Sequence, residues 1–169
     1  MTNKETASMQ AGFERALGEI RTRVSLSGSG VARIALAYSG GLDSAALLHL
    51  LHAYGQAQQV EVYAFHVHHG LSANADEWLA HCRAQCAALG VTFDARQVQV
   101  TRKEKNGIEE AARQSRYAAL GDMCRAHGVP LLLTAHHLDD QAETVLLQLL
   151  RGSGAVSYTH LTLPTICSV

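Results

Sequence analysis

The chain has 169 residues, of which 47% are hydrophobic and 17% charged, and its formal net charge at pH 7 is −1. This length and apolar content suffice for one α/β domain with a buried core and exclude an intrinsically disordered chain. No apolar run reaches the roughly 18 residues of a transmembrane helix, and the polar N-terminus has no signal-peptide core. We therefore expect a cytoplasmic protein that binds no membrane. Its near-neutral charge creates no basic field for nucleic acid.

Apolar runs and turn signals alternate regularly along the sequence. In chain order, the predicted elements are helix 10–24, strand 31–38, helix 43–54, strand 60–67, helix 73–89, strand 91–100, helix 108–127, strand 129–135 and helix 138–150. Apolar strands that alternate with helices predict an α/β fold, a parallel sheet with helices on both faces. In such a sheet, ligands bind outside the carboxyl ends of the strands.

Two predicted helices have candidate core positions. On one face of the first helix these are Phe13, Leu17, Ile20 and Val24. In helix 73–89 they include Trp78, Cys82 and Leu89.

The four cysteines are Cys82, Cys86, Cys124 and Cys167. The first two are one helical turn apart, a spacing that could suit a metal, but no second pair at zinc spacing follows. We interpret the cysteines as reduced, partly buried thiols.

The motif Ser39-Gly40-Gly41-Leu42-Asp43-Ser44 lies between a predicted strand and a predicted helix. Amides at a helix start have no partner within the helix and carry the positive end of its dipole. Two glycines let a phosphate approach the main chain, and the hydroxyls of Ser39 and Ser44 add donors. Asp43 could cap the helix or help hold Mg²⁺. An ordinary glycine turn is the alternative, but all six positions together favour phosphate binding.

The motif lacks the lysine of a Walker-type loop and does not match the G-x-G-x-x-G fingerprint. It resembles the PP-loop of the ATP pyrophosphatase superfamily. The resemblance implies that the loop holds the β- and γ-phosphates of ATP, which is cleaved between its α- and β-phosphates. The substrate is adenylated and pyrophosphate leaves.

Three histidines, His66, His68 and His69, stand at the end of the second predicted strand. Imidazole is a common metal ligand. However, His66 and His68 point to the same face of a strand, and the motif holds no carboxylate to complete a site. We interpret these histidines as a wall of the nucleotide pocket.

A second polar motif, residues 134–144, follows the fourth predicted strand. Asp139 and Asp140 precede Glu143 at the spacings of neighbours on a helix. Helix capping is one interpretation. Because two histidines precede three acids, we favour a Mg²⁺ site, a grip on a substrate ammonium, or a general base.

A third motif, residues 107–117, spaces Glu109 and Arg113 for a helical ion pair on a solvated face. Alternatively, Arg113 and Arg116 meet phosphates or an adenylated product. The spacing does not decide between these interpretations.

Five segments within residues 31–154 together resemble the bacterial tRNA(Ile)-lysidine synthetase family. In order, they read A-Y-S-G-G-L-D-S, H-V-H-H-G-L-S-A-N-A-D, G-I-E-E-A-A-R-Q-S-R-Y, T-A-H-H-L-D-D-Q-A-E-T and L-L-R-G-S-G. The resemblance implies that ATP adenylates the C2 carbonyl oxygen of the wobble cytidine in a tRNA(Ile) with a CAU anticodon. The ε-amine of free L-lysine then displaces AMP and forms lysidine.

The same resemblance implies roles for individual residues. The ATP-binding residues would be Ser39, Gly40, Gly41, Leu42, Asp43 and Ser44. Arg113 would stabilise the activated intermediate. The residues that would bind Mg²⁺, bind the lysine or take its proton are His136, Asp139, Asp140 and Glu143. The candidate Mg²⁺ ligands are Asp43 and Asp140.

The family pattern breaks off after residue 155. We expect residues 1–155 to form a C-terminally incomplete catalytic domain and residues 156–169 to be a non-native tail, such as translated vector sequence. The tRNA-gripping domains of the family would then be missing, and the fragment could be inactive. Two alternatives stay open, a thiolase-like PP-loop tRNA-modifying enzyme and a non-catalytic ATP-binding module. A homodimer is also left open.

Overall fold

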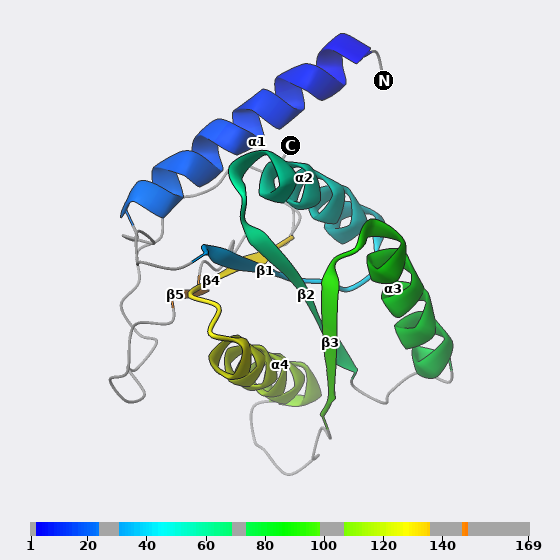
Figure 1. Ribbon diagram of the computed structural model, residues 1–169. Coiled ribbons are helices and arrows are strands. Elements are labelled where there is room, and N and C mark those ends of the chain that lie inside the picture. The colour runs from blue at the N-terminus through cyan, green and yellow to red at the C-terminus, as the bar shows by residue number, and fades with distance from the viewer. Residues whose placement is uncertain (1–2, 24–30, 69–73, 99–106, 136–146, 149–169) are drawn as a thin grey trace.

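The computed structural model describes residues 3–23, 31–68, 74–98, 107–135 and 147–148 (Figure 1). Its elements are α1 (Asn3–Arg23), β1 (Arg33–Ala37), α2 (Leu42–Gln58), β2 (Glu61–His68), α3 (Ala75–Leu89), β3 (Thr92–Gln97), α4 (Gly107–His127), β4 (Leu131–Thr134) and β5 (Leu147–Gln148). The predicted alternation is confirmed from α1 to β4. The main difference in bounds is the start of α1, which lies at Asn3.

The strands form one sheet in the order β3-β2-β1-β4-β5. β1 is parallel to β2 on one side and to β4 on the other, and β3 is parallel to β2. Parallel neighbours need crossover connections, and helices α2, α3 and α4 supply them. The α/β fold predicted from the sequence is therefore confirmed.

Strand β5 corrects one prediction, because residues 138–150 were expected to be a helix. Leu147 and Gln148 instead pair antiparallel with Leu132 and Leu131 of β4. All four residues of β4 are buried, and main-chain groups along the edge of a buried strand need partners. Pairing along this edge therefore outweighs helical periodicity at these two residues. The rest of that predicted helix lies outside the described residues.

Alternate residues of β1 point into two separate cores. Ile34 and Leu36 pack in the core that contains side chains of α1, α2 and α3. Ala35 packs with Phe65 of β2 and Met123 of α4 in the other. Helices thus cover both faces, α1 to α3 on one and α4 on the other (Figure 1).

The core positions predicted for the first helix are confirmed where the structure describes them. Leu17 and Ile20 are buried, and Phe13 packs against the same core. The ring of Phe13 meets that of Tyr54 on α2 edge to face, with centroids 6.3 Å apart. Val24 lies outside the described residues.

The prediction for Trp78 is wrong, because this side chain is 47% exposed. Cys82, one turn later on α3, is fully buried, and Leu89 is partly buried against the same core. Helical periodicity correctly turns Trp78 to the sheet side of α3. However, Trp78 stands in the first turn of the helix, level with the loop after β1, so its ring meets that loop instead of the core.

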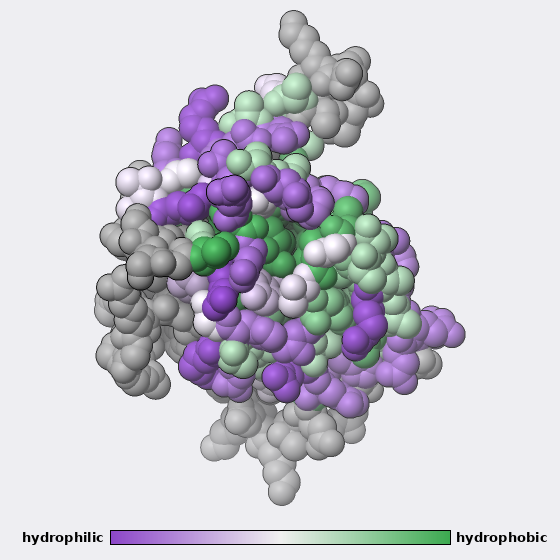
Figure 2. Space-filling model, in the orientation of Figure 1, coloured by the Kyte–Doolittle hydropathy of each residue, from purple (hydrophilic) through white to green (hydrophobic). Residues whose placement is uncertain are grey.

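Polar residues form most of the face seen in Figure 2, with apolar residues gathered toward its middle. Within the described residues, the exposed large hydrophobic side chains are Val31, Leu42 and Trp78. Leu42 and Trp78 both belong to the surroundings of the loop after β1. No helix in the described part of the chain has the length and apolarity needed to cross a membrane.

Three cysteines are free thiols inside the two cores. Burial raises the pKa of Cys82 and of Cys86 to about 11, and that of Cys124 to about 12. The interpretation as reduced, buried thiols is confirmed for these three. Cys167 lies outside the described residues.

We predict that these three thiols resist a thiol-exchange reagent in the native protein, because the reaction needs an accessible thiolate. The measurement is an Ellman titration at about pH 8, where thiols of ordinary pKa react. In a Cys167→Ser variant, we expect no reactive thiol before guanidinium is added and three afterwards. Fast native reaction at any of the three would contradict the core packing.

Candidate functional site

The sheet reverses its order at the carboxyl ends of β1 and β4. From β1 the chain continues to β2 and β3 on one side and then returns to β4 on the other. The register pairs Ala37 with Thr134, so the segments that leave these two strands start beside each other. Ligands of open α/β sheets bind in the crevice at such a reversal. The loop Ser39–Ser44 begins just after β1 and therefore lies at this position.

This loop carries the chain from β1 into α2 through its two glycines. Gly40 has a φ of 83°, in the left-handed region. Gly41 caps α2 with extended backbone, at φ −71° and ψ 167°. Ala45 N–H donates to Gly41 O at 2.9 Å, and the amides that precede Ala45 have no partner within the helix. With the helix dipole, those amides make this end of α2 attractive to an anion.

The hydroxyls of Ser39 and Ser44 hold the loop in shape. Ser44 Oγ donates to Gly41 O at 3.0 Å and lies 3.0 Å from Ser39 Oγ. Since the Ser44 proton is used at Gly41, Ser39 is the donor between the two hydroxyls. Gly41 N–H in turn donates to Ser39 Oγ at 3.4 Å. Both hydroxyl protons and the Gly41 N–H are thus used inside the loop, which leaves its other main-chain amides as donors toward an anion.

Two aromatic side chains fix the carbonyls that precede Gly40. His66 Nδ1 on β2 lies 2.8 Å from Tyr38 O, and Trp78 Nε1 on α3 donates to Ser39 O at 2.6 Å. A carbonyl only accepts, so the Nδ1 of His66 carries the proton. Burial lowers the pKa of His66, which favours the neutral ring. Both side chains therefore support the loop through its backbone.

Gly40 is packed directly against α3. A Cβ atom at this position would lie 2.5 Å from Cys82 Sγ and 3.0 Å from Trp78 Nε1. The Cys82 thiol also lies 3.8 Å from Ser39 O. The prediction that Trp78 lies in the core did not include this contact with the loop. The sequence feature that indicates such a contact is the indole N–H, which needs a hydrogen-bond partner when the ring is packed.

His68, at the end of β2, is 7% exposed. Neither ring nitrogen makes a hydrogen bond within the described part of the chain, although Nε2 lies 3.2 Å from Asp76 Oδ1 in the first turn of α3. His69 lies outside the described residues. Among the residues that are described, no cluster of three histidine, cysteine or acidic side chains could hold a metal ion.

The other candidate residues come from both faces of the sheet. Asp43 is exposed in the first turn of α2. Arg113 is exposed on α4, with its guanidinium carbon 5.8 Å from the ring centroid of Tyr117. Because α2 and α4 cover opposite faces, Asp43 and Arg113 lie on opposite sides of the sheet. Outside the described residues, soon after the end of β4, lie His136, Asp139, Asp140 and Glu143.

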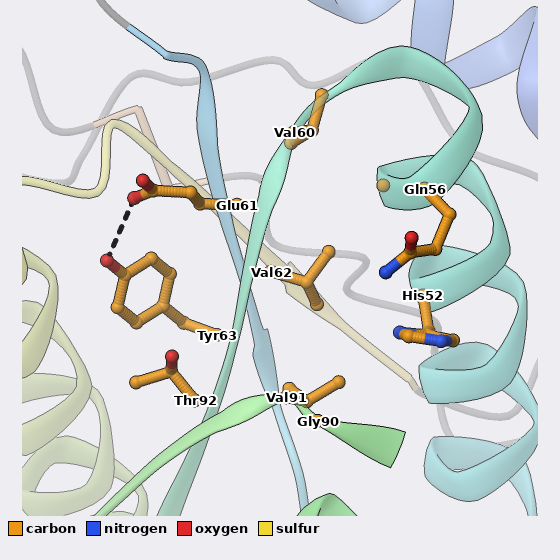
Figure 3. A pocket seen from close by; sticks show the side chains of 10 residues that line it. His52, Gln56, Val60, Glu61, Val62, Tyr63, Gly90, Val91 and Thr92 are labelled. Carbon is orange, nitrogen blue, oxygen red and sulfur yellow. Dashed lines mark hydrogen bonds between the residues drawn. The ribbon is translucent and has the colours of Figure 1, made fainter.

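A cavity of about 370 Å³ opens at the opposite end of the strands from the loop, near the amino ends of β2 and β3 (Figure 3). It is lined by His52 and Gln56 of α2 and by residues near the amino ends of β2 and β3, among them Thr92. The Tyr63 hydroxyl donates to Glu61 Oε2 beside it, at 3.1 Å. Ligands of parallel sheets bind at the carboxyl ends of the strands. We therefore assign the candidate site to the loop.

Known proteins similar to this chain point to one family. A family model described as a PP-loop domain matches residues 9–162. The tRNA(Ile)-lysidine synthase of Ralstonia nicotianae is 58% identical over 127 residues, 74% of this chain and 28% of that protein. The tRNA(Ile)-lysidine synthase of Xanthomonas campestris pv. campestris is 50% identical over 123 residues, 73% of this chain and 28% of that protein. The chain thus spans little more than a quarter of the length of these curated relatives.

Among solved structures, the U34-tRNA thiolase NcsA from Methanococcus maripaludis, described with its 4Fe-4S cluster, is similar with a TM-score of 0.55. The match covers 73% of this chain and 46% of the thiolase at 18% sequence identity. A likeness at this identity concerns the fold alone.

We predict that Gly40→Ala abolishes pyrophosphate binding and lowers the free energy of unfolding by about 1–3 kcal/mol. Alanine would be strained at the positive φ of this position, and its Cβ would collide with Cys82. Isothermal titration with pyrophosphate and urea unfolding measure the two effects. Gly12→Ala is the matched control, because Gly12 is an exposed helical residue with nothing within 4 Å of its Cβ position. Equal binding by wild type and Gly40→Ala would contradict the loop geometry.

We also predict that His66 makes stability depend on pH. Its folded pKa is lowered by burial, so the unfolded state binds more protons as pH falls below the ordinary histidine pKa of about 6.5. Stability from His66 is thus present above about pH 6.5 and lost toward lower pH. His66→Asn keeps an N–H donor close to the position of Nδ1 but cannot titrate, so its urea midpoint should fall less between about pH 7 and 5. Identical slopes for the two proteins would refute this role.

Proposed function

Because the chain belongs to the PP-loop domain family, we propose that the loop Ser39–Ser44 binds the β- and γ-phosphates of ATP. One observation carries the proposal, a glycine turn that opens α2 at the reversal point of the sheet. Phosphate oxygens accept hydrogen bonds from main-chain amides at such a helix start, and the dipole favours their charge. The proposed cleavage lies between the α- and β-phosphates, as the resemblance to the PP-loop superfamily implies. The motif also lacks the lysine of a Walker-type loop.

We propose that the chain is the adenylating part of a tRNA(Ile)-lysidine synthase. Relatives with that name are 50% and 58% identical over about three quarters of this chain. In the proposed reaction, the C2 carbonyl oxygen of the wobble cytidine attacks the α-phosphorus of ATP. The bond between the α- and β-phosphates breaks and pyrophosphate leaves. The ε-amine of L-lysine then attacks C2, the C2–O bond to AMP breaks, and lysidine forms.

The residue types fit the two chemical needs of this reaction. A pyrimidine carbonyl oxygen is a poor leaving group, and adenylation converts it into AMP. Lysine is protonated at neutral pH, so its ammonium must be bound and then deprotonated. For these steps we propose the polar segment after β4, with His136, Asp139, Asp140 and Glu143. The Arg113 guanidinium is proposed to neutralise the phosphate of the adenylated intermediate.

Mg²⁺ is the second proposed cofactor. In nucleotide sites, this ion is typically bound by one or two carboxylates together with substrate phosphates. Asp43 fits that role, because its carboxylate is exposed in the first turn of α2, beside the proposed phosphate position. Asp140 is the second proposed ligand. Bound there, the ion would offset negative charge on the phosphates.

The remaining elements of the proposal concern the whole protein. The chain spans about a quarter of the length of the relatives, so the tRNA(Ile) with a CAU anticodon, the free L-lysine and the cytoplasmic setting are proposed as properties of the complete enzyme. Residues 1–155 are proposed as part of its catalytic domain, with residues 156–169 outside it.

A thiolase-type reaction is the second candidate, since a tRNA thiolase shares the fold. Such chemistry needs a reactive thiolate or a cluster-binding cysteine. Burial raises the pKa of all three described cysteines to about 11 or 12. This observation favours the lysidine reaction.

The test measures pyrophosphate release from ATP with a tRNA(Ile) transcript and lysine. The chain is assayed by itself and fused after residue 155 to the corresponding continuation of the Ralstonia nicotianae relative. We expect the fusion to release pyrophosphate only with a transcript that has cytidine at the wobble position, and to form lysidine only with lysine. Asp43→Ala should slow the reaction by about a hundredfold or more while the protein stays folded.

A transcript with uridine at the wobble position and arginine in place of lysine are the matched controls. Release of ADP and phosphate in place of AMP and pyrophosphate would refute the proposed cleavage. Equal pyrophosphate release without tRNA, or equal product formation with arginine, would refute the assignment to lysidine formation.

A further inference from the structure

The contact between Trp78 and the Ser39 carbonyl joins α3 to the proposed phosphate loop. Trp78 Nε1 donates to Ser39 O at 2.6 Å, a short N–H···O hydrogen bond. The ring is 47% exposed, and it stacks on His81 with centroids 5.3 Å apart and planes 25° apart. An indole placed in the core would bury far more of its surface. The position of Trp78 is therefore better explained by its hydrogen bond to the loop than by core packing.

The hydrogen bond also determines the direction of the next amide. The peptide between Ser39 and Gly40 is trans, since the chain has no cis peptide in its described part, so its C=O and N–H point in opposite directions. With the carbonyl held toward α3, the Gly40 N–H points away from α3. Helix α3 contacts β2 and β3, whereas the reversal point lies between β1 and β4, on the other side of β1. The N–H is thus turned toward the side where the ligand crevice lies.

Gly40 cannot hold this direction by itself. Glycine at positive φ has the largest range of accessible backbone conformations, so a loop built on it needs external restraints. Within the described residues these restraints are the His66 contact to Tyr38 O, the Trp78 bond to Ser39 O, and the Cys82 side chain packed against Gly40. Two of the three act on the peptide that contains the Gly40 N–H, and the Trp78 bond to Ser39 O, at 2.6 Å, is much shorter than the 3.8 Å contact of the Cys82 thiol.

We propose that Trp78 is a positioning residue of the phosphate loop, which orients the Gly40 amide toward the phosphates of the nucleotide. The inference rests on the proposed ATP binding at this loop and adds a determinant outside it. Trp78 touches no reacting atom in this account. Trp78 orders the loop before the nucleotide binds, so less conformational entropy is lost on binding. Its loss should therefore weaken binding of phosphate groups and leave binding of the nucleoside unchanged.

The test compares wild type with Trp78→Phe, which keeps an aromatic ring and removes the N–H donor. Equilibrium dialysis measures dissociation constants for Mg·ATP and for adenosine. We expect Trp78→Phe to weaken Mg·ATP binding about fivefold to tenfold, the range of one net hydrogen bond, with adenosine unchanged. Gln85→Ala is the matched control, because Gln85 is an exposed residue of the same helix, and it should bind both ligands as wild type does.

Two nuclear magnetic resonance measurements decide the same point without nucleotide. Trp78 is the only tryptophan of the chain, so a single indole N–H signal reports on the bond. It should exchange slowly with solvent although the ring is half exposed. In Trp78→Phe, the Gly40 amide order parameter should fall from the rigid range near 0.85 toward the flexible range.

The outcomes separate the two proposals. Absence of Mg·ATP binding by wild type would refute the proposed function, whereas indole exchange and Gly40 order would still decide the positioning role. Equal Mg·ATP affinity of wild type and Trp78→Phe, with equal Gly40 order, would overturn the inference. An indole N–H that exchanges as fast as free indole would also overturn it. If Trp78→Phe does not fold, the exchange rate in wild type carries the test.

Discussion

The left-handed turn at Gly40 is the constraint on which the site depends. It converts the buried strand β1 into the first turn of α2 within a few residues, and it requires a residue without a Cβ. The turn is stable because its neighbours remove the freedom that glycine brings. His66 fixes the carbonyl of Tyr38, Trp78 fixes that of Ser39, and Ser44 binds Gly41 O. An anion-binding helix start is thereby held ready, with little ordering left to the ligand.

The two cores explain why this turn can be held so firmly. Strand β1 is central in the sheet, and its alternate residues fill opposite cores. Its carboxyl end therefore moves only if both cores move. Helix α3 shares the core with α2 through Cys82 and Cys86, and its first turn reaches past the strand ends to the loop. The same helix thus stabilises the core with its later turns and the loop with its first turn.

Much of the fold could be predicted from local sequence patterns. The wrong predictions concerned contacts between residues that lie far apart in the sequence. The alternation of β1 and the glycine pair before α2 depend on neighbours in sequence, so the parallel sheet and the position of the loop were predictable. The exposure of Trp78 was not, because periodicity gives the face of a helix but not how far its first turn extends beyond the sheet. The pairing of Leu147 with Leu132 was missed because edge pairing depends on a distant strand. The predictions for His136, Asp139, Asp140 and Glu143 stay predictions.

The most direct measurement for the central claim is a nuclear magnetic resonance titration of the backbone amides with Mg·ATP. The account predicts that the largest shifts fall on the amides of residues 39–44, with Gly40 and Gly41 foremost. It also predicts that the amide signals of the residues that line the cavity beside His52 and Gln56 do not shift. Largest shifts at that cavity, or no saturable shifts in the loop, would contradict the claim that this loop is the phosphate site.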